Sequence, residues 1–134
     1  LQAHGYQVIS TDLVYRGFGD PEPLDFLKET LDGFEGDIIT NPPYSTGLEF
    51  VQRALESVRP GGKVAMFLKV QFLEGQKRGA FFKNTPPPYS LHIPFPFGLY
   101  KNGDMSVKPE SAIAYAWYVW EKGFTGDPVI KWFN

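Results

Sequence analysis

Segments with the character of buried strands alternate with segments of helical character in this chain of 134 residues. Residues 6–10 (YQVIS), 36–40 (GDIIT) and 63–70 (KVAMFLKV) are short and apolar, as buried strands are. Two segments that lie between these strands show helical character. They are residues 23–34 (PLDFLKETLDGF) and a segment after residue 46. Alternation of this kind is typical of a parallel sheet covered by helices on both faces. We therefore expect an α/β fold.

The boundaries of the later segments are less regular. Thr46 and Glu49 match a capping box, and apolar residues follow at helical spacing until an Arg-Pro-Gly-Gly sequence ends the segment. Residues 72–84 are expected to form a helix or an irregular crossover, before the proline-rich residues 85–98. Residues 111–123 (SAIAYAWYVWEKG) are rich in β-branched and aromatic side chains, which favour a strand. We expect this strand to be antiparallel and to lie near one edge of the sheet.

The composition limits the class of protein. With 43% hydrophobic and 16% aromatic residues, the chain is long enough for one domain with a core, and we expect residues 1–134 to form a single domain. The absence of cysteine fits a reducing compartment. No apolar run reaches membrane-spanning length, and the sequence LQAHGYQV lacks the regions of a signal peptide. We expect a cytoplasmic protein with no membrane partner.

Charge is unevenly distributed along the chain. Residues 1–62 are net negative, whereas residues 63–108 are net positive although the whole chain carries a net charge of −2. A basic segment attracts polyanions such as nucleic acid, but an ordinary solvated surface explains it equally well. Its basic residues include Lys69, Lys77, Arg78, Lys83, Lys101 and Lys108.

An Asn-Pro-Pro-Tyr sequence directly follows the predicted strand at residues 36–40. It could be a simple strand-ending turn, because Asn-Pro dipeptides often mark turns. Ligands of parallel sheets bind at the carboxyl ends of the strands, and Asp12 also follows a predicted strand. We therefore expect Asp12 and Asn41-Pro42-Pro43-Tyr44 at the same edge of the sheet.

The residue types at this position suit a particular chemistry. The amide oxygen of Asn41 and the carbonyl oxygen of Pro42 are two acceptors that the rigid prolines keep available. Tyr44 adds a ring on which a planar group could stack. Amino groups on aromatic rings and amide nitrogens are poor nucleophiles because their lone pairs are delocalised. Acceptors aimed at both N–H bonds stabilise the positive charge that develops when such a nitrogen forms a bond.

These residues resemble a known family. NPPY at a strand end, with acidic residues in STDL and PLDFL, resembles S-adenosylmethionine-dependent amino-methyltransferases. The ordered set LVYRGFG, DFL, TNPPY, FLEGQKR and AWYVWEKG is similar to the phage and prophage type of adenine-N6 DNA methyltransferase, over nearly the whole chain. The resemblance implies a Rossmann-like class I methyltransferase fold, with a doubly wound and mostly parallel sheet.

The resemblance also implies roles for individual residues. Asp12, with Leu13 beside it, would bind the ribose hydroxyls of S-adenosylmethionine, and Asp25 and Phe26 would bind its adenine. In the NPPY sequence, Asn41 would contact both cofactor and target. The implied catalytic residues are Asn41, Pro42, Pro43 and Tyr44, with Tyr44 stacking on an adenine flipped out of the DNA duplex. The implied DNA-binding residues are Lys69, Lys77 and Arg78. The family needs no metal for this reaction.

One feature departs from the family. The glycine-rich loop that holds the methionine end of the cofactor, and the first strand before it, have no counterpart ahead of LQAHGYQV. In the family's sheet that strand lies between the strands that end at Asp12 and at Thr40. We therefore expect a partial methyltransferase domain that lacks the N-terminal first strand, and we expect these residues alone to bind S-adenosylmethionine weakly and a longer chain to restore binding.

Three functions remain open on the sequence. The leading one is transfer of a methyl group to adenine N6 in DNA. A second is methylation of RNA or of a protein glutamine amide, because the same acceptors suit those nitrogens. The third is a catalytically inactive methyltransferase-like fragment. The recognition sequence and the oligomeric state do not follow from the sequence.

Overall fold

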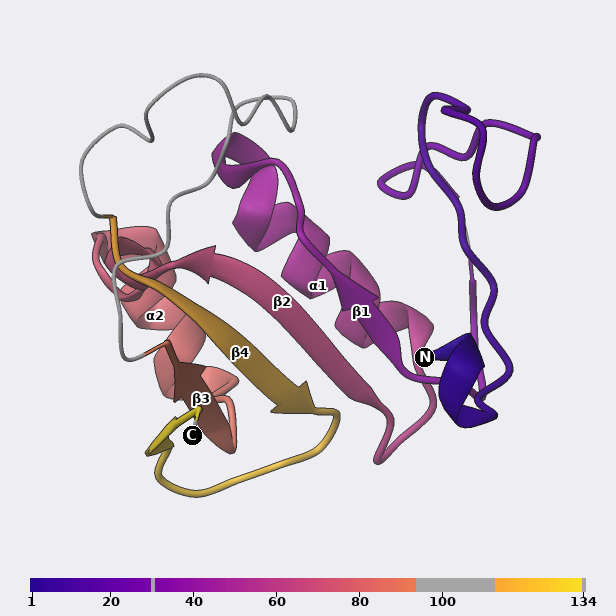
Figure 1. Cartoon of the computed structure of the whole chain (residues 1–134). Helices are drawn as coiled ribbons and strands as arrows, with labels where there is room; N and C mark the ends of the chain where they lie inside the picture. Colours follow the sequence, from indigo (N-terminus) through magenta and orange to yellow (C-terminus); the bar gives the residue numbers. More distant parts are fainter. Residues whose placement is uncertain (30, 94–112, 134) are drawn as a thin grey trace. The chain divides into compact units, whose positions relative to one another are not determined.

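A computed structural model describes residues 1–29, 31–93 and 113–133 of the chain (Figure 1). It divides into two compact units, residues 1–31 and residues 32–134. The expectation that the chain forms a single domain stays a prediction. Lys101 and Lys108 of the basic segment lie outside the described residues, as do the first two residues of the predicted strand at 111–123.

The first unit contains a short 3-10 helix, η1 (Gln2–His4), followed by turns and irregular chain. The strand predicted at residues 6–10 is not formed, and Ile9 within it is 73% exposed. A strand needs a neighbour for its backbone hydrogen bonds, and the described part of this unit contains no other strand. That prediction was wrong.

The helix predicted at residues 23–34 is also absent. The amides of Lys28 and Glu29 both donate to the carbonyl oxygen of Asp25, at 2.9 and 3.1 Å, and form a single turn that does not continue. Most helical stability in proteins comes from packing of an apolar face, and the described residues of this segment are at most partly buried. Local propensity alone does not hold a helix here.

The second unit is built on a five-stranded sheet (Figure 1). The strand order is β1-β2-β4-β3-β5, in which β4 is antiparallel to both neighbours and the two outer pairs are parallel. The strands are β1 (Ile38–Thr40), β2 (Lys63–Lys69), β3 (Tyr89–His92), β4 (Tyr115–Glu121) and β5 (Val129–Trp132). A mixed α/β arrangement is therefore confirmed.

Strand β4 is antiparallel, as predicted, but it lies third of five strands rather than near an edge. Ala116, Tyr118 and Trp120 within it are fully buried. A strand this apolar buries most surface when both of its edges are paired and a face is covered, and this places it inside the sheet. Strands β3 and β5 were not predicted, because proline and loop-like residues surround them.

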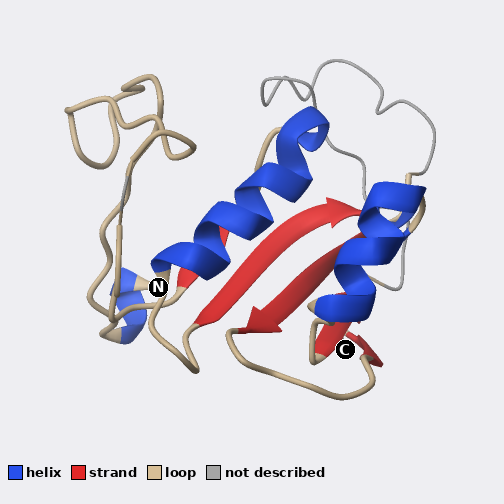
Figure 2. Ribbon diagram, turned by 180° about the vertical axis from the view of Figure 1, so that it is seen from behind, coloured by secondary structure: helices blue, strands red, loops and turns tan. Residues whose placement is uncertain are grey.

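Both described α-helices lie on the same face of the sheet (Figure 2). They are α1 (Gly47–Ser57) and α2 (Gln76–Asn84), each preceded by a 3-10 turn, η2 (Tyr44–Thr46) and η3 (Val70–Leu73). The expected cover of helices on both faces is not found in the described part of the chain. Thr46 is the N-cap of α1, as predicted, but its hydroxyl makes no capping hydrogen bond.

The core lies between these helices and the covered face of the sheet. Met66 and Leu68 of β2 and Tyr118 and Trp120 of β4 are at most 1% exposed. Phe72 of η3 contacts the rings of Tyr118 and Trp120, with centroids 5.8 and 6.5 Å away. The indole N–H of Trp120 donates to the carbonyl oxygen of Thr85, just after α2, at 3.1 Å. The buried indole therefore has a hydrogen-bond partner. This packing fixes the loops that follow β1 and β2.

Candidate functional site

The NPPY segment lies at the carboxyl end of β1. Thr40, the last residue of β1, is paired with Met66, and the two strands are parallel. Pro42 and Pro43 have no N–H to continue the ladder, so the strand ends and the chain turns into η2. The carboxyl ends of β1 and β2 therefore meet at one edge of the sheet, where the sequence predicted a binding site.

Two acceptors in this segment are free within the described structure. Asn41 is exposed and Pro42 is buried. Neither the side-chain amide of Asn41 nor the carbonyl oxygen of Pro42 accepts a hydrogen bond from any described residue. The carbonyl oxygen of Pro43 is used instead by Thr46, whose amide donates at 3.1 Å and whose hydroxyl lies at 3.4 Å. The turn is thus closed without consuming the first two acceptors.

The ring of Tyr44 has neighbours from two strands. The Lys69 ammonium at the end of β2 lies 5.2 Å from the ring centroid, in the geometry of a cation–π contact. The ring of Tyr115, the first residue of β4, lies 5.9 Å away. Burial, together with the electrostatic effect of Tyr115 and a hydrogen bond with it, raises the pKa of Tyr44 to about 12. The phenol of Tyr44 therefore stays neutral at physiological pH.

An aromatic row extends from Tyr44 across the sheet face opposite the helices. Tyr115 stacks on Phe67 at 5.3 Å, and Phe67 contacts Trp117 at 5.1 Å. The sequence predicted a strand at residues 111–123 but did not indicate any contact between it and the NPPY segment. The contact between Tyr44 and Tyr115 depends on the pairing of β2 with β4, in which Lys69 lies opposite Tyr115. No pattern within either segment could have revealed it.

Two of the predicted nucleic-acid-binding residues lie with Tyr44 around one cavity. Lys77 and Arg78, in the first turn of α2, line a cavity of about 420 Å³ whose wall includes Tyr44. The Arg78 guanidinium lies over the ring of Phe72, 5.3 Å from its centroid, and its Nε donates to the carbonyl oxygen of Glu74. Together with Lys69, all three predicted basic residues are near the NPPY segment.

Four of the five predicted cofactor residues belong to the first unit, namely Asp12, Leu13, Asp25 and Phe26, whereas the fifth, Asn41, belongs to the second. The Asp12 carboxylate is exposed, with the amide of Val14 at 3.4 Å from Oδ1 and the Arg16 Nε at 4.0 Å from Oδ2. Asp12 ends no strand here, because residues 6–10 form none. Leu13 is 61% exposed.

Asp25 has closer partners than Asp12. The Lys28 ammonium lies 3.0 Å from Oδ2, and the amide of Leu27 donates to Oδ1 at 3.2 Å. The hydrogen bond with Lys28 lowers the pKa of Asp25 below its usual value. Phe26, the next residue, is half-buried. Whether these residues share a cleft with Asn41 stays a prediction.

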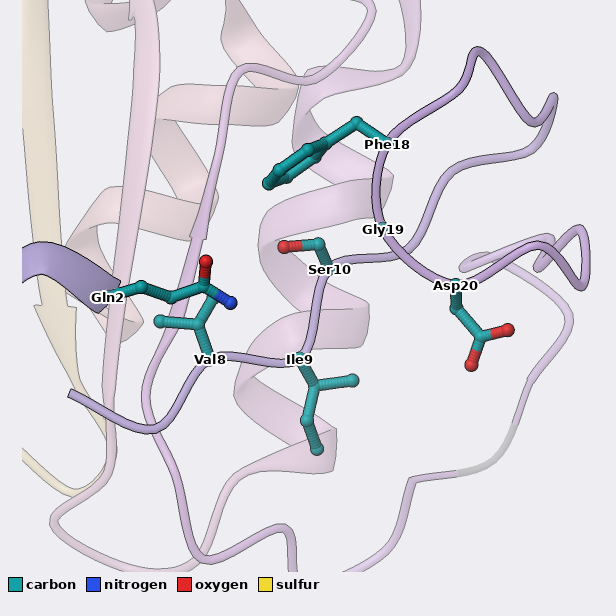
Figure 3. Close-up of a pocket in the computed structure, with 7 residues that line it drawn as sticks. All are labelled: Gln2, Val8, Ile9, Ser10, Phe18, Gly19 and Asp20. Atoms are coloured by element: carbon teal, nitrogen blue, oxygen red, sulfur yellow. The ribbon is translucent and has the colours of Figure 1, made fainter.

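The first unit also contains a pocket that the sequence did not indicate (Figure 3). Its volume is about 390 Å³. None of the four cofactor residues predicted in this unit lines it, that is, Asp12, Leu13, Asp25 or Phe26. The amide of Asp20 donates to the carbonyl oxygen of Ser10 at 2.8 Å and closes the loop between them. The lining residues are Gln2, Val8, Ile9, Ser10, Phe18, Gly19 and Asp20.

No protein-family model matches the chain, and no curated protein matches it. Among the residues that the structure describes, no cluster of three or more His, Asp or Glu side chains is placed to hold a metal ion. Within those same ranges, no helix has both the length and the apolar character needed to span a bilayer.

Proposed function

We propose that this chain belongs to an S-adenosylmethionine-dependent methyltransferase that acts on the N6 amino group of adenine in DNA. The observation that carries the proposal is the NPPY segment at the carboxyl end of β1. There the amide of Asn41 and the carbonyl oxygen of Pro42 accept no hydrogen bond from the described protein. Two free acceptors that lie two and three residues before Tyr44 in the chain suit an amino group on a planar base.

The chemistry assigned to these residues is electrostatic. The two N–H bonds of an adenine amino group would donate to the Asn41 amide oxygen and the Pro42 carbonyl oxygen. As the nitrogen forms a bond to carbon it gains positive charge, and both acceptors stabilise that charge. The surplus proton then passes to water. Pro43 fixes the backbone between Pro42 and Tyr44, and Tyr44 stacks on the base.

S-adenosylmethionine, when bound, supplies the methyl group from a sulfonium centre and leaves as a thioether. Asp12 fits the role of ribose ligand, because its carboxylate is exposed and its nearest donors are at 3.4 Å or beyond. Asp25 fits the adenine less directly, because Lys28 and Leu27 already donate to it. A carboxylate has about four acceptor positions, so one further donor can still be accommodated.

Nucleic acid is favoured over protein by the charge around the site. Lys69 lies over Tyr44, and Lys77 and Arg78 share a cavity with it. Three cations near one aromatic ring suit a phosphodiester chain, whereas a neutral glutamine side chain offers them no partner. We propose DNA as the polymer on the resemblance of the ordered motifs, and RNA remains the competing outcome of the test.

The test is methyl transfer by the purified protein from labelled S-adenosylmethionine to duplex DNA, to RNA of the same sequence and to a glutamine-containing peptide. We expect label in N6-methyladenine of the DNA, identified by mass spectrometry of the nucleosides. Label in RNA or peptide but not in DNA would overturn the choice of substrate.

Cofactor binding is measured separately by calorimetric titration of S-adenosylmethionine into the complete wild-type protein and into its Asp12→Asn and Asp25→Asn variants. We expect both substitutions to weaken binding. Equal affinity of all three proteins would show that the cofactor residues are assigned wrongly. The exposed Asp127→Asn serves as a matched control, because Asp127 lies in the turn before β5.

A further inference from the structure

The cavity beside Tyr44 is formed by two segments of the second unit. It has a volume of about 420 Å³ and is open to solvent over much of its surface. Tyr44 and Glu49 line it from η2 and α1, and Gln76, Lys77 and Arg78 line it from the start of α2. We refer to it as the α1–α2 cavity.

The α1–α2 cavity is distinct from the pair of acceptors proposed to hold the reacting nitrogen. Tyr44 belongs to both places, but neither Asn41 nor Pro42 lines the cavity. A group in the cavity would therefore not be the reacting amino group. It would be another part of the same substrate, in contact with Tyr44.

The lining of the α1–α2 cavity suits an anion attached to a polar, partly planar group. Lys77 and Arg78 outnumber the single carboxylate, Glu49. Both cations lie in the first turn of α2, where the helix dipole disfavours positive charge and where an anionic ligand would relieve it. Gln76 and Glu49 add an amide and a carboxylate, which recognise sugar hydroxyls and base edges.

Arg78 is held in place by the protein. Its guanidinium lies over Phe72, and its Nε donates to the carbonyl oxygen of Glu74. An arginine has five N–H donors, so this bond leaves others for a ligand. Gly75 permits the close approach, since an added Cβ there would lie 3.2 Å from an Arg78 terminal nitrogen. A guanidinium fixed in this way loses little freedom when it binds a phosphate.

We propose that the α1–α2 cavity binds the nucleotide next to the target base, with Lys77 and Arg78 on its phosphate. This inference rests on the proposed function, because it identifies the target base with the group stacked on Tyr44. It adds a subsite for the flanking nucleotide. An acidic peptide is the alternative occupant that the experiment tests.

The experiment measures equilibrium binding of a short duplex over a series of salt concentrations, and the duplex contains an adenine that the methyl-transfer assay has shown to be labelled. The protein is compared with its Lys77→Met and Lys83→Met variants. Lys77 lines the cavity, whereas Lys83 lies in the last turn of the same helix and does not. We expect Lys77→Met to weaken binding several-fold and to reduce the slope of log K against log salt by about one. We expect Lys83→Met to leave the slope unchanged.

A duplex with one neutral methylphosphonate next to the target adenine locates the contact. The wild-type protein should bind this duplex more weakly than it binds the unmodified duplex. The Lys77→Met variant should bind the two duplexes equally, because it has already lost the contact with that phosphate. Equal losses of affinity in Lys77→Met and Lys83→Met would overturn the inference. It would also be overturned if the effect of Lys77→Met on affinity were the same whichever phosphate of the duplex is neutral. Competition by poly-glutamate as strong as competition by DNA would assign the cavity to an acidic peptide instead.

Methylation of the same duplex by the wild-type protein is measured in parallel. Absence of DNA methylation would count against the proposed function, whereas full methylation with indistinguishable binding by the two lysine variants would count against the α1–α2 cavity alone. The two failures are therefore distinguishable.

Discussion

The ammonium of Lys69 lies over the ring of Tyr44, 5.2 Å from its centroid. Both residues lie at or just beyond the carboxyl ends of two paired strands. Lys69 is the last residue of β2, and Tyr44 comes four residues after the last residue of β1. Their contact places a cation beside the ring proposed to stack on the target base. In the proposed complex, this lysine would be available to a phosphate of the nucleic acid.

Removal of the Tyr44 ring is expected to impair methyl transfer. Stacking of a base on an aromatic side chain contributes about 1–3 kcal/mol, so Tyr44→Ala should lower kcat/KM by roughly fivefold to 150-fold, and Tyr44→Phe should retain most activity. Steady-state methylation of duplex DNA measures this. Tyr89→Ala in β3 is the matched control. Tyr89 also carries a lysine over its ring, because the ammonium of Lys131 in β5 lies 4.6 Å from its centroid. Wild-type kinetics of Tyr44→Ala would exclude the stacking role.

Substitution of Asn41 by alanine in the complete protein is expected to abolish most turnover while affecting cofactor affinity less, because its amide acts mainly on the target nitrogen. Loss of one preorganised acceptor at a developing charge costs on the order of a hundredfold in kcat. Single-turnover methylation and calorimetric binding of S-adenosylmethionine separate the two effects. Asn84→Ala provides the control, since the Asn84 amide donates to the carbonyl oxygen of Ala80 within α2, at 3.1 Å. Near-normal turnover by Asn41→Ala would rule the mechanism out.

Alkaline pH is expected to destabilise the fold through two tyrosines. Burial raises the pKa of both Tyr44 and Tyr118 from 10.0 to about 12. Between these values the unfolded chain has released protons that the folded chain retains, so the unfolding free energy falls as pH rises from about 10 to about 12. Urea unfolding across this range measures the fall. In Tyr118→Phe the fall should be shallower, and a fall as steep as that of the wild type would contradict the assignment to Tyr118.

Two glycines are expected to respond oppositely to alanine. A Cβ on Gly62, between α1 and β2, would lie 2.7 Å from the Cβ of Val58 and 2.9 Å from the carbonyl oxygen of Arg59, so Gly62→Ala should destabilise by about 1–3 kcal/mol. Gly79 lies inside α2 with nothing within 4 Å of such a Cβ, so Gly79→Ala should stabilise by about 0.5–1 kcal/mol. Urea denaturation of both variants checks the signs. The same sign in both would show that the packing around Gly62 is described wrongly.

Several elements could be predicted from local sequence because their residues alone decide them. The β-branched residues before Asn41 form β1, and the two prolines end it. The apolar spacing after Thr46 forms α1, and the aromatic residues of β4 form a strand. In each case the signal lies within a few residues and agrees with the packing that the segment finds.

The segments at residues 6–10 and 23–34 carry similar local signals, yet neither a strand nor a helix forms there. A strand is stable only beside another strand, and a short amphipathic helix only against an apolar surface. The described part of the first unit provides no second strand, and it leaves large apolar residues such as Ile9 and Phe18 exposed. Periodicity indicates what a segment could form, whereas its neighbours decide whether it does.

The candidate site shows the same division. The sequence by itself determined the acceptors of Asn41 and Pro42 and their place at a strand end, because proline restricts the backbone around it. Only the tertiary structure brought Lys69 and Tyr115 to Tyr44, and Lys77 and Arg78 to the same cavity. Those contacts join residues that are 25 or more positions apart in the chain. They depend on strand pairing and helix packing, which are determined by the burial of apolar surface between segments distant in sequence. The spacing of residues within a single motif therefore cannot predict them.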